Sequence, residues 1–373
     1  MQSTLISSAR RSSDLAVYER RPLGVRAFPV VLALSGVILV ALLVVHIVVG
    51  TVELTPAQVL KALLNRADAE LHRQVVWGLR LPRALVAIGA GALLGLAGAI
   101  LQTVTRNPLA DSSLLGVSSG GVLAVVVWIA LVGRGAGMES LPDTGLMLPV
   151  LAFVGGLAAA GLVYLLSWQG GATDTTRLIL TGVLVGGMCS AFTSVLLLWA
   201  DESSVQRILR WTIGSTAGRV WDHWHTLWPA AVLALPFGLA CAGLANVLQL
   251  GDDVAAGLGV RVERARLALL LASALLAAGA VAVVGNVGFI GLIGPHMARR
   301  IVGQDVRRLF PFSAVLAAIL LVASDIVART LTLDGLGRLL GLALPPGAGM
   351  PVGAVTALLG APFFLLLLLR RSR

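Results

Sequence analysis

The sequence predicts an all-α polytopic membrane protein. Of its 373 residues, 57% are hydrophobic and only 12% are charged, about half the charged fraction of an ordinary soluble domain. The apolar residues gather in runs of about twenty, the length that a helix needs to cross the hydrocarbon core of a bilayer. The 43 glycines suit close contact between helices in lipid. We therefore expect a multi-pass protein of the inner (plasma) membrane, in contact with lipid.

Ten apolar runs are candidate transmembrane helices, and together they predict one transmembrane domain at 28–371. The first run is 28–50, and the others lie at about 82–105, 114–133, 146–168, 177–200, 225–247, 265–284, 289–303, 311–331 and 351–369. The run at 289–303 is short and begins Gly288-Phe-Ile-Gly291, which indicates a break at its start. An even number of spans puts both termini on one side.

Arginine predicts which side that is. Residues 1–27 form a polar tail rich in arginine, and three arginines follow the last span, so we expect both termini in the cytoplasm. The run at 28–50 is too long for the apolar part of a signal peptide. A substantial share of the basic residues nevertheless falls on the predicted outer side.

Two segments outside the spans have a recognisable character. Residues 55–66 begin with Thr55 and Pro56, a plausible N-cap with proline at the first helical position, which predicts a short interfacial helix. Residues 201–224 are polar and rich in tryptophan, as expected at the level of the lipid headgroups. The longest predicted inner loop is 249–266, and no large soluble domain is present.

Composition and motifs argue against several functions. The only lysine is Lys61, which follows Leu60, so a nucleotide-binding loop of the Walker type cannot form. Any ATP and magnesium must then be held by another chain, and we expect no catalytic residue, no metal and no cofactor in this one. The net charge of +10 is spread over short loops, which disfavours nucleic acid. His223 and His225 lack a third ligand for a metal.

One carboxylate stands out within the predicted spans. Asp325 lies near the outer end of the ninth span, and Arg329 follows four residues later on the same helical face. This spacing predicts a structural ion pair between the two rather than a proton relay. The scarcity of other carboxylates in the spans disfavours a carrier driven by protons or sodium.

Ordered motifs run along nearly the whole chain, from about residue 30 to 371. They are Arg80-Leu-Pro-Arg83, Gln102 with Asn107-Pro-Leu-Ala-Asp111, Leu115-Gly-Val-Ser-Ser-Gly120, Leu248-Gln-Leu-Gly-Asp252, Gly288-Phe-Ile-Gly-Leu292 with Pro295-His296, and Ala323-Ser-Asp-Ile-Val-Ala-Arg329. In this order they resemble the permease subunits of ATP-driven, binding-protein-dependent importers for iron-siderophores, haem and cobalamin.

The resemblance implies an architecture and partners. Each subunit of the family has ten transmembrane helices, and two subunits, identical or paralogous, form a twenty-helix core. Two ATPase subunits dock on the cytoplasmic side, and a substrate-binding protein delivers the chelate from outside. Ferric siderophores are the commonest cargo of the family, so they are the expected ligand, with haem or cobalamin as the alternative.

The resemblance also implies three sets of functional residues. Arg80, Arg83 and Arg329 match arginines that dock the binding protein, and guanidinium groups suit a reversible contact with carboxylates. Thr175 and Thr176 match the inner gate. The inner loop reads as a short helix started by aspartate and stopped by glycine, and matches the element that couples the ATPase: Gly251, Asp252, Asp253, Val254, Ala255, Ala256, Gly257, Leu258 and Gly259.

One stretch departs from the family pattern. Gly349 stands where the family usually has glutamate before the last span, and the preceding outer loop, 333–349, is longer than usual. We therefore expect the entry to the tenth span to differ from that of the family.

Overall fold

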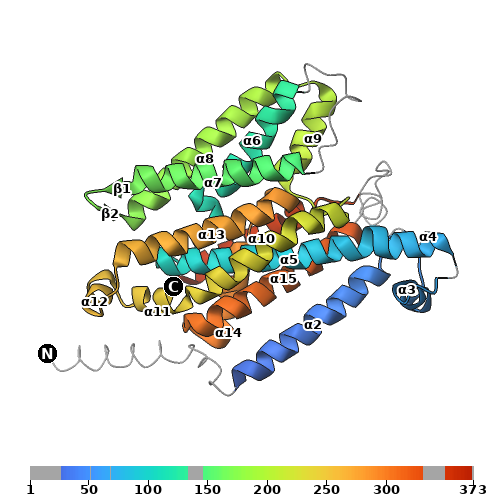
Figure 1. The fold of residues 1–373 in the computed structure, drawn as a ribbon, viewed down its shortest axis with the longest axis horizontal. Helices are drawn as coiled ribbons and strands as arrows, with labels where there is room; N and C mark the ends of the chain where they lie inside the picture. The colour runs from blue at the N-terminus through green and yellow to red at the C-terminus, as the bar shows by residue number, and fades with distance from the viewer. Residues whose placement is uncertain (1–26, 51, 68, 133–145, 331–348, 372–373) are drawn as a thin grey trace, which may run out of the picture.

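The computed structural model describes residues 27–50, 52–67, 69–132, 146–330 and 349–371 (Figure 1). These residues are almost entirely helical; their one sheet is a short antiparallel hairpin of β1 (Trp168–Gln169) and β2 (Ala172–Thr173). The helices are α2 (Phe28–Val48), α3 (Pro56–Leu63), α4 (Glu70–Arg73), η3 (Gln74–Arg80), α5 (Leu81–Val104), η4 (Ser112–Leu115), α6 (Val117–Val132), α7 (Met147–Ser167), α8 (Thr175–Leu198), α9 (Glu202–Ile213), α10 (Trp221–Ala240), α11 (Ala242–Gln249), α12 (Asp252–Gly257), α13 (Val262–Val284), α14 (Ile290–Val302), α15 (Val306–Thr330) and α17 (Val352–Arg371).

Among the described residues, six helices are long and apolar enough to cross a membrane, and α10 with α11 makes a seventh if this pair, bent by 41°, is one span. The runs predicted near 114–133 and 351–369 form the shorter apolar helices α6 and α17. The run at 289–303 forms α14, and the predicted break is confirmed, because Phe289 has a φ of 67° and the helix begins after it. The polytopic class is thus confirmed, whereas the count of ten stays a prediction.

Helix α5 lies at the centre of the core and packs against α10, α13, α14 and α15, while α6, α7, α8 and α9 form a second group next to α13 (Figure 1). Small residues let α5 approach its neighbours. A Cβ on Gly91 would lie 2.7 Å from the Cα of Ala318 on α15, and a Cβ on Gly98 would overlap the carbonyl oxygen of Gly291 on α14. The packing role that glycine suggested is therefore confirmed at these contacts.

The second span starts earlier than predicted. Helical structure runs without a break from Glu70 to Val104, so Arg80-Leu-Pro-Arg83 lies inside a helix instead of leading into one. The segment just before Pro82 is the π-helix η3, in which the N–H of Leu81 bonds to the carbonyl of Val76. Proline offers no N–H to its preceding turn, and the wider π turn accommodates this defect without breaking the helix.

Two predicted extramembrane elements are found. Helix α3 begins after Thr55, whose side chain and that of Gln58 cap each other's backbone N–H groups, as expected for a capping box. The segment 201–224 contains α9 and the start of α10, where Trp221 stacks on Trp77 and donates to its carbonyl at 2.7 Å. The tail at 1–26 and the outer loop at 331–348 lie outside the described residues.

Candidate functional site

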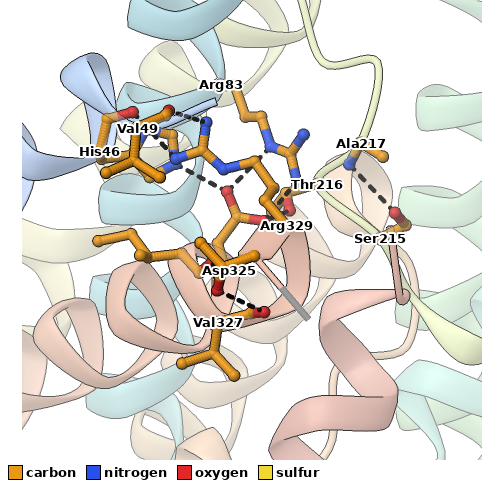
Figure 2. A network of polar contacts seen from close by, with 11 residues as sticks. His46, Val49, Arg83, Ser215, Thr216, Ala217, Asp325, Val327 and Arg329 are labelled. Carbon is orange, nitrogen blue, oxygen red and sulfur yellow. Dashed lines mark hydrogen bonds and ion pairs between the residues drawn. The ribbon is translucent and has the colours of Figure 1, made fainter. Parts of the chain in front are cut away.

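A buried carboxylate organises one end of the helix bundle. Asp325 of α15 is fully buried and accepts two hydrogen bonds from Arg83 of α5, at 2.9 Å from Nε and 2.7 Å from Nη2. His46 of α2 lies 2.7 Å from the same carboxylate, and the hydroxyl of Thr216 also donates to it (Figure 2). A buried charge is tolerable only when it is paired and hydrogen-bonded, and these partners satisfy it.

Asp325 forms an ion pair, but the predicted partner, Arg329, is wrong. The carboxylate pairs with Arg83, whose fork-shaped guanidinium meets both oxygens, a geometry that a neighbour on the same helix does not reach here. Arg329 instead donates to the carbonyls of His46 at 2.9 Å and Val49 at 3.3 Å. The network therefore ties α2, α5 and α15 together, and Asp325 remains a structural residue.

Arg80 is directed inward as well. Its side chain is buried and donates to the carbonyls of Ile47 and Val48, both at 2.7 Å, and to that of Val52. The last carbonyls of a helix lack partners within the helix and attract cations, so Arg80 caps the end of α2. A Cβ on Gly50 would lie 2.8 Å from the Arg80 guanidinium, so a larger residue there would have to displace this side chain.

These arginines line one cavity of about 420 Å³. Arg80, Arg83 and Arg329 share it with Arg219, a residue that the sequence reasoning missed. Arg219 lies 5.9 Å from the ring centre of Trp211 and 3.0 Å from Nε2 of His223. Burial lowers the pKa of Arg219 to about 10, so it stays cationic at neutral pH. Its position just after the turn at Gly218 is the only signal that sequence offered.

Gly349 lies at the rim of the same cavity. A Cβ at this position would lie 2.9 Å from the carbonyl oxygen of Ala328, so the glycine fits where a larger residue would need the backbone to shift. The glutamate of the family pattern would bring a negative charge to the arginines. Without it the described cavity lining keeps the positive charge of four guanidinium groups, offset only by the buried Asp325.

The predicted inner helix exists as α12. It spans Asp252–Gly257, with Gly251 at φ 113° before it and Gly259 at φ 81° just beyond it. These two backbone conformations favour glycine, which is why the sequence located the element correctly. Val254 and Leu258 are 50% and 63% exposed. The helix thus presents apolar side chains to its surroundings while its first residue is held from behind.

That first residue is held by two arginines. Asp252 accepts from Arg106, which follows α5, at 2.5 Å, and from Arg266 of α13 at 2.6 Å. Partial burial alone would raise the pKa of Asp252, but the hydrogen bonds and positive charges of Arg266 and Arg106 hold it below its usual value. The carboxylate is therefore ionised at neutral pH.

Arg266 connects α12 to the predicted gate. Besides Asp252, its guanidinium donates to the carbonyl of Thr173 at 2.6 Å. Glu263, one turn earlier on α13, accepts from the backbone N–H of Thr173 at 3.1 Å and from its hydroxyl. Thr173 ends the β1–β2 hairpin and is followed by Asp174, the N-cap of α8. Sequence spacing gave no sign of this bridge.

Thr175 and Thr176 are the first two residues of α8, half-buried and exposed respectively. The structure thus brings the predicted gate and the predicted coupling element together through α13. It keeps the arginine cavity apart from them: α12 and the hairpin lie at one end of the bundle, and α2 meets α5 at the other (Figure 1).

The histidine pair of α10 has other partners. The ring nitrogens of His223 contact Arg219 and the N–H of Val220, and His225 lies against Trp221. Among the described residues no three side chains of the metal-ligating types cluster together.

The chain matches the FecCD transport family over residues 38–370. It is 36% identical over 343 residues to the iron(3+)-hydroxamate import system permease protein FhuG of Bacillus subtilis, covering 92% of this chain and 97% of that protein. It is 38% identical over 311 residues to the hemin transport system permease protein HmuU of Yersinia pestis, covering 82% and 85%. A solved metal-chelate type ABC transporter in an inward-facing conformation aligns with a TM-score of 0.77 and 28% identity, over 92% of this chain and 99% of that one.

Proposed function

We propose, because the chain belongs to the FecCD transport family, that it carries ferric siderophores across the inner membrane as the permease subunit of an ATP-driven importer. The chain is a multi-pass membrane permease rather than an enzyme, and the family expected from its motifs is confirmed. The family match, over residues 38–370, covers nearly all of the stretch along which those motifs run.

The topology that we propose has ten spans with both termini in the cytoplasm. It adds the bent pair α10–α11 and the shorter helices α6, α14 and α17 to the six long apolar helices. A second permease subunit, the same chain or a paralogue, would complete a twenty-helix core. Helix α8 suits the face between the subunits, because Leu184, Met188 and Phe192 are each about 60% exposed with no described helix covering them.

Two ATPase subunits, which hold the ATP and magnesium, would dock on the cytoplasmic side against α12. The observation that carries this proposal is the bridge behind α12. The exposed Val254 and Leu258 face outward, while Asp252 is fixed to Arg266 and through it to Thr173. A displacement of α12 by the ATPase would therefore move the start of α8, where Thr175 and Thr176 would open or close the inner gate.

On the outer side, the arginine cavity suits an acidic patch of a substrate-binding protein. The positive field comes from Arg80, Arg83 and Arg329, the residues that the resemblance implied, together with Arg219. Arg83 is neutralised by Asp325 and Arg80 is held by the carbonyls at the end of α2, whereas Arg329 and Arg219 each have an Nε without a partner among the described residues. We therefore assign direct pairing with a carboxylate to Arg329 and Arg219. The other two raise the local potential that steers the partner.

The cargo is proposed from the relatives. Their names specify iron(3+)-hydroxamate for one and hemin for another, so ferric siderophore is our first assignment and haem, or cobalamin, the alternative. The test is ATP hydrolysis by the reconstituted importer with its binding protein loaded in turn with a ferric hydroxamate, hemin or cobalamin. Stimulation by the ferric hydroxamate alone supports the assignment, and stimulation by hemin or cobalamin alone replaces it.

A further inference from the structure

A second basic cavity lies beside α12, between the ends of α5, α11 and α14. Its volume is about 460 Å³, and its lining includes Gln102, Arg106, Gln249, Arg299 and Arg300. No carboxylate is among the described lining residues. Arg106 is already neutralised by Asp252, so Arg299 and Arg300 supply the uncompensated charge. An anion of at least one negative charge therefore fits this cavity electrostatically.

Two lining groups have bonding capacity that the described residues leave unused. Arg299 is half-buried and makes no ion pair with a described carboxylate. Gln102 is 2% exposed, and its Nε2 faces the carbonyls of Gly291 and Leu292 at 3.5 and 3.4 Å. Because carbonyls only accept, this orientation of the amide is fixed, and Oε1 is left buried without a donor among the described residues. A ligand that offers both negative charge and a hydroxyl would satisfy both groups.

Exposed apolar side chains lie on α10 and α11, the two helices that precede the lining residue Gln249 in the chain. Leu233 on α10 is 74% exposed, Leu244 on α11 is 38% exposed, and Leu250 next to the lining residue Gln249 is 61% exposed. Acyl chains can pack along such a face while a charged headgroup enters the cavity at its end. Basic cavities between transmembrane helices on the cytoplasmic side suit anionic phospholipid headgroups in this manner. These exposed apolar side chains favour a lipid over a free phosphate ion.

We propose that this cavity binds the phosphate headgroup of an anionic phospholipid, with Arg299 and Arg300 on the phosphate and Oε1 of Gln102 accepting from a headgroup hydroxyl. Phosphatidylglycerol has this chemistry. Only the assignment to the inner leaflet rests on the proposed orientation. A lipid seated here would contact α5 and α14 next to α12, and would brace the part of the bundle against which the ATPase is proposed to push.

Native mass spectrometry of the purified full chain, titrated with phosphatidylglycerol or phosphatidylcholine, tests the site without any transport assay. We expect phosphatidylglycerol to bind the wild type more tightly, and R299Q/R300Q to lose roughly tenfold or more of this affinity, as for two arginine–phosphate contacts. The matched control is R307Q/R308Q, which removes the same charge from exposed Arg307 and from Arg308, paired with Asp305; it should bind like the wild type. R299K/R300K should retain most of the affinity and shows that the fold tolerates change there.

Further measurements distinguish a bound phospholipid from a free phosphate ion and from a protein contact. Phosphatidic acid lacks the alcohol hydroxyls of the glycerol headgroup, so Gln102→Met should abolish a preference for phosphatidylglycerol over phosphatidic acid. Displacement of the lipid by millimolar inorganic phosphate would keep the anion site but assign it to a free ion. Equal lipid affinity of the wild type and R299Q/R300Q would overturn the proposal, and if that variant instead lost a co-purifying ATPase, the cavity would be a protein contact. Because lipid binding is measured directly, the result stands even if the importer assignment fails.

Discussion

The guanidinium of Arg266 lies 2.6 Å from the carboxylate of Asp252 and, through its other nitrogen, 2.6 Å from the carbonyl oxygen of Thr173. One side chain of α13 thus holds both the first residue of α12 and the last residue of the hairpin that precedes α8. Arg266 and Thr173 are both buried, so their contact is shielded from competing water, whereas Asp252 is partly exposed. In the proposed importer, α12 is where the ATPase acts and the start of α8 is where the path closes. In this proposed mechanism, Arg266 would transmit a movement of α12 to the gate.

Arg266→Gln should uncouple the importer. The variant keeps α12 but loses the charged bridge, so we expect ATP hydrolysis to persist while uptake per ATP falls roughly threefold to thirtyfold, the range of typical coupling energies. Uptake and hydrolysis measured together in proteoliposomes check this. Exposed Arg264 on the same helix gives the control, Arg264→Gln, which should behave like the wild type. Parallel loss of both activities would argue against a coupling role.

The bridge should weaken only in acid. The pKa of Asp252 is held below its ordinary value of about 3.9, so the charged form stabilises the fold at and above that pH. This stabilisation is lost as the pH falls through the lowered pKa. The stability difference between the wild type and Asp252→Asn should be constant from about pH 8 to 5 and shrink below about pH 4. Asp252 is 45% exposed, so the difference should be small; a difference that grew on acidification would contradict this linkage.

Breaking the buried network at Asp325 should destabilise the protein strongly. Asp325→Asn leaves Arg83 without its carboxylate in a buried site, and removal of one partner of such a pair costs about 3–5 kcal/mol. Thermal unfolding in detergent measures the effect. The surface pair of Glu70 and Arg73, with both side chains about half exposed, provides the comparison: Glu70→Gln should change stability far less than Asp325→Asn, because solvent screens an exposed pair. Similar effects at both sites would mean that the network is not structural.

The close contact between α5 and α14 gives a prediction on packing. Gly98→Ala forces a methyl group against the carbonyl of Gly291, and since the obstacle is backbone, the helices must separate, at a cost of about 1–3 kcal/mol. Gly243→Ala on α11 is the control, because a Cβ there meets nothing within 4 Å. The unfolding temperature should fall for the first variant and stay or rise slightly for the second. An unchanged temperature for Gly98→Ala would disprove the tight contact.

The arginine cavity predicts that the affinity of the binding protein depends on salt concentration. Arg329→Gln and Arg219→Gln should each weaken docking of the binding protein about fivefold at low salt, and less as ionic strength rises, because salt screens the attraction between two charged surfaces that approach each other through water. Affinity measured at two salt concentrations checks this. Arg66→Gln, an exposed arginine near α3 outside the cavity, should leave docking unchanged. Equal weakening by all three variants would point to general charge instead of this cavity.

Local signals in the sequence predicted local structure well. The starting aspartate Asp252 and the stopping glycine Gly259 located α12, and Gly288 marked the break before α14, because both depend on backbone conformations that neighbouring residues determine. The partner of Asp325 could not be predicted in this way. Arg329 is four residues away, but the partner chosen is Arg83, 242 positions away in sequence, and only the packing of α5 on α15 brings it there.

The π-helix η3 and the contacts of Arg266 with Asp252 and Thr173 could not be predicted from sequence either. The apolar run predicted a span from about residue 82, whereas η3 and α4 extend the helix back to Glu70. Arg266 and Arg219 carry no motif, and their roles come from Thr173 and the cavity that the fold places beside them. The ends and breaks of helices could therefore be predicted from sequence, whereas the partners of side chains that join helices could not.

In the proposed mechanism this permease imports its substrate by coupling to a separate ATPase through α12. The most direct test purifies the chain from its own membrane in mild detergent, identifies the proteins that accompany it, and measures uptake by the reconstituted assembly with and without ATP. We predict a co-purifying ATPase and uptake that requires ATP, the loaded binding protein and an intact α12. A chain that purifies alone and moves substrate into liposomes without ATP would contradict this mechanism.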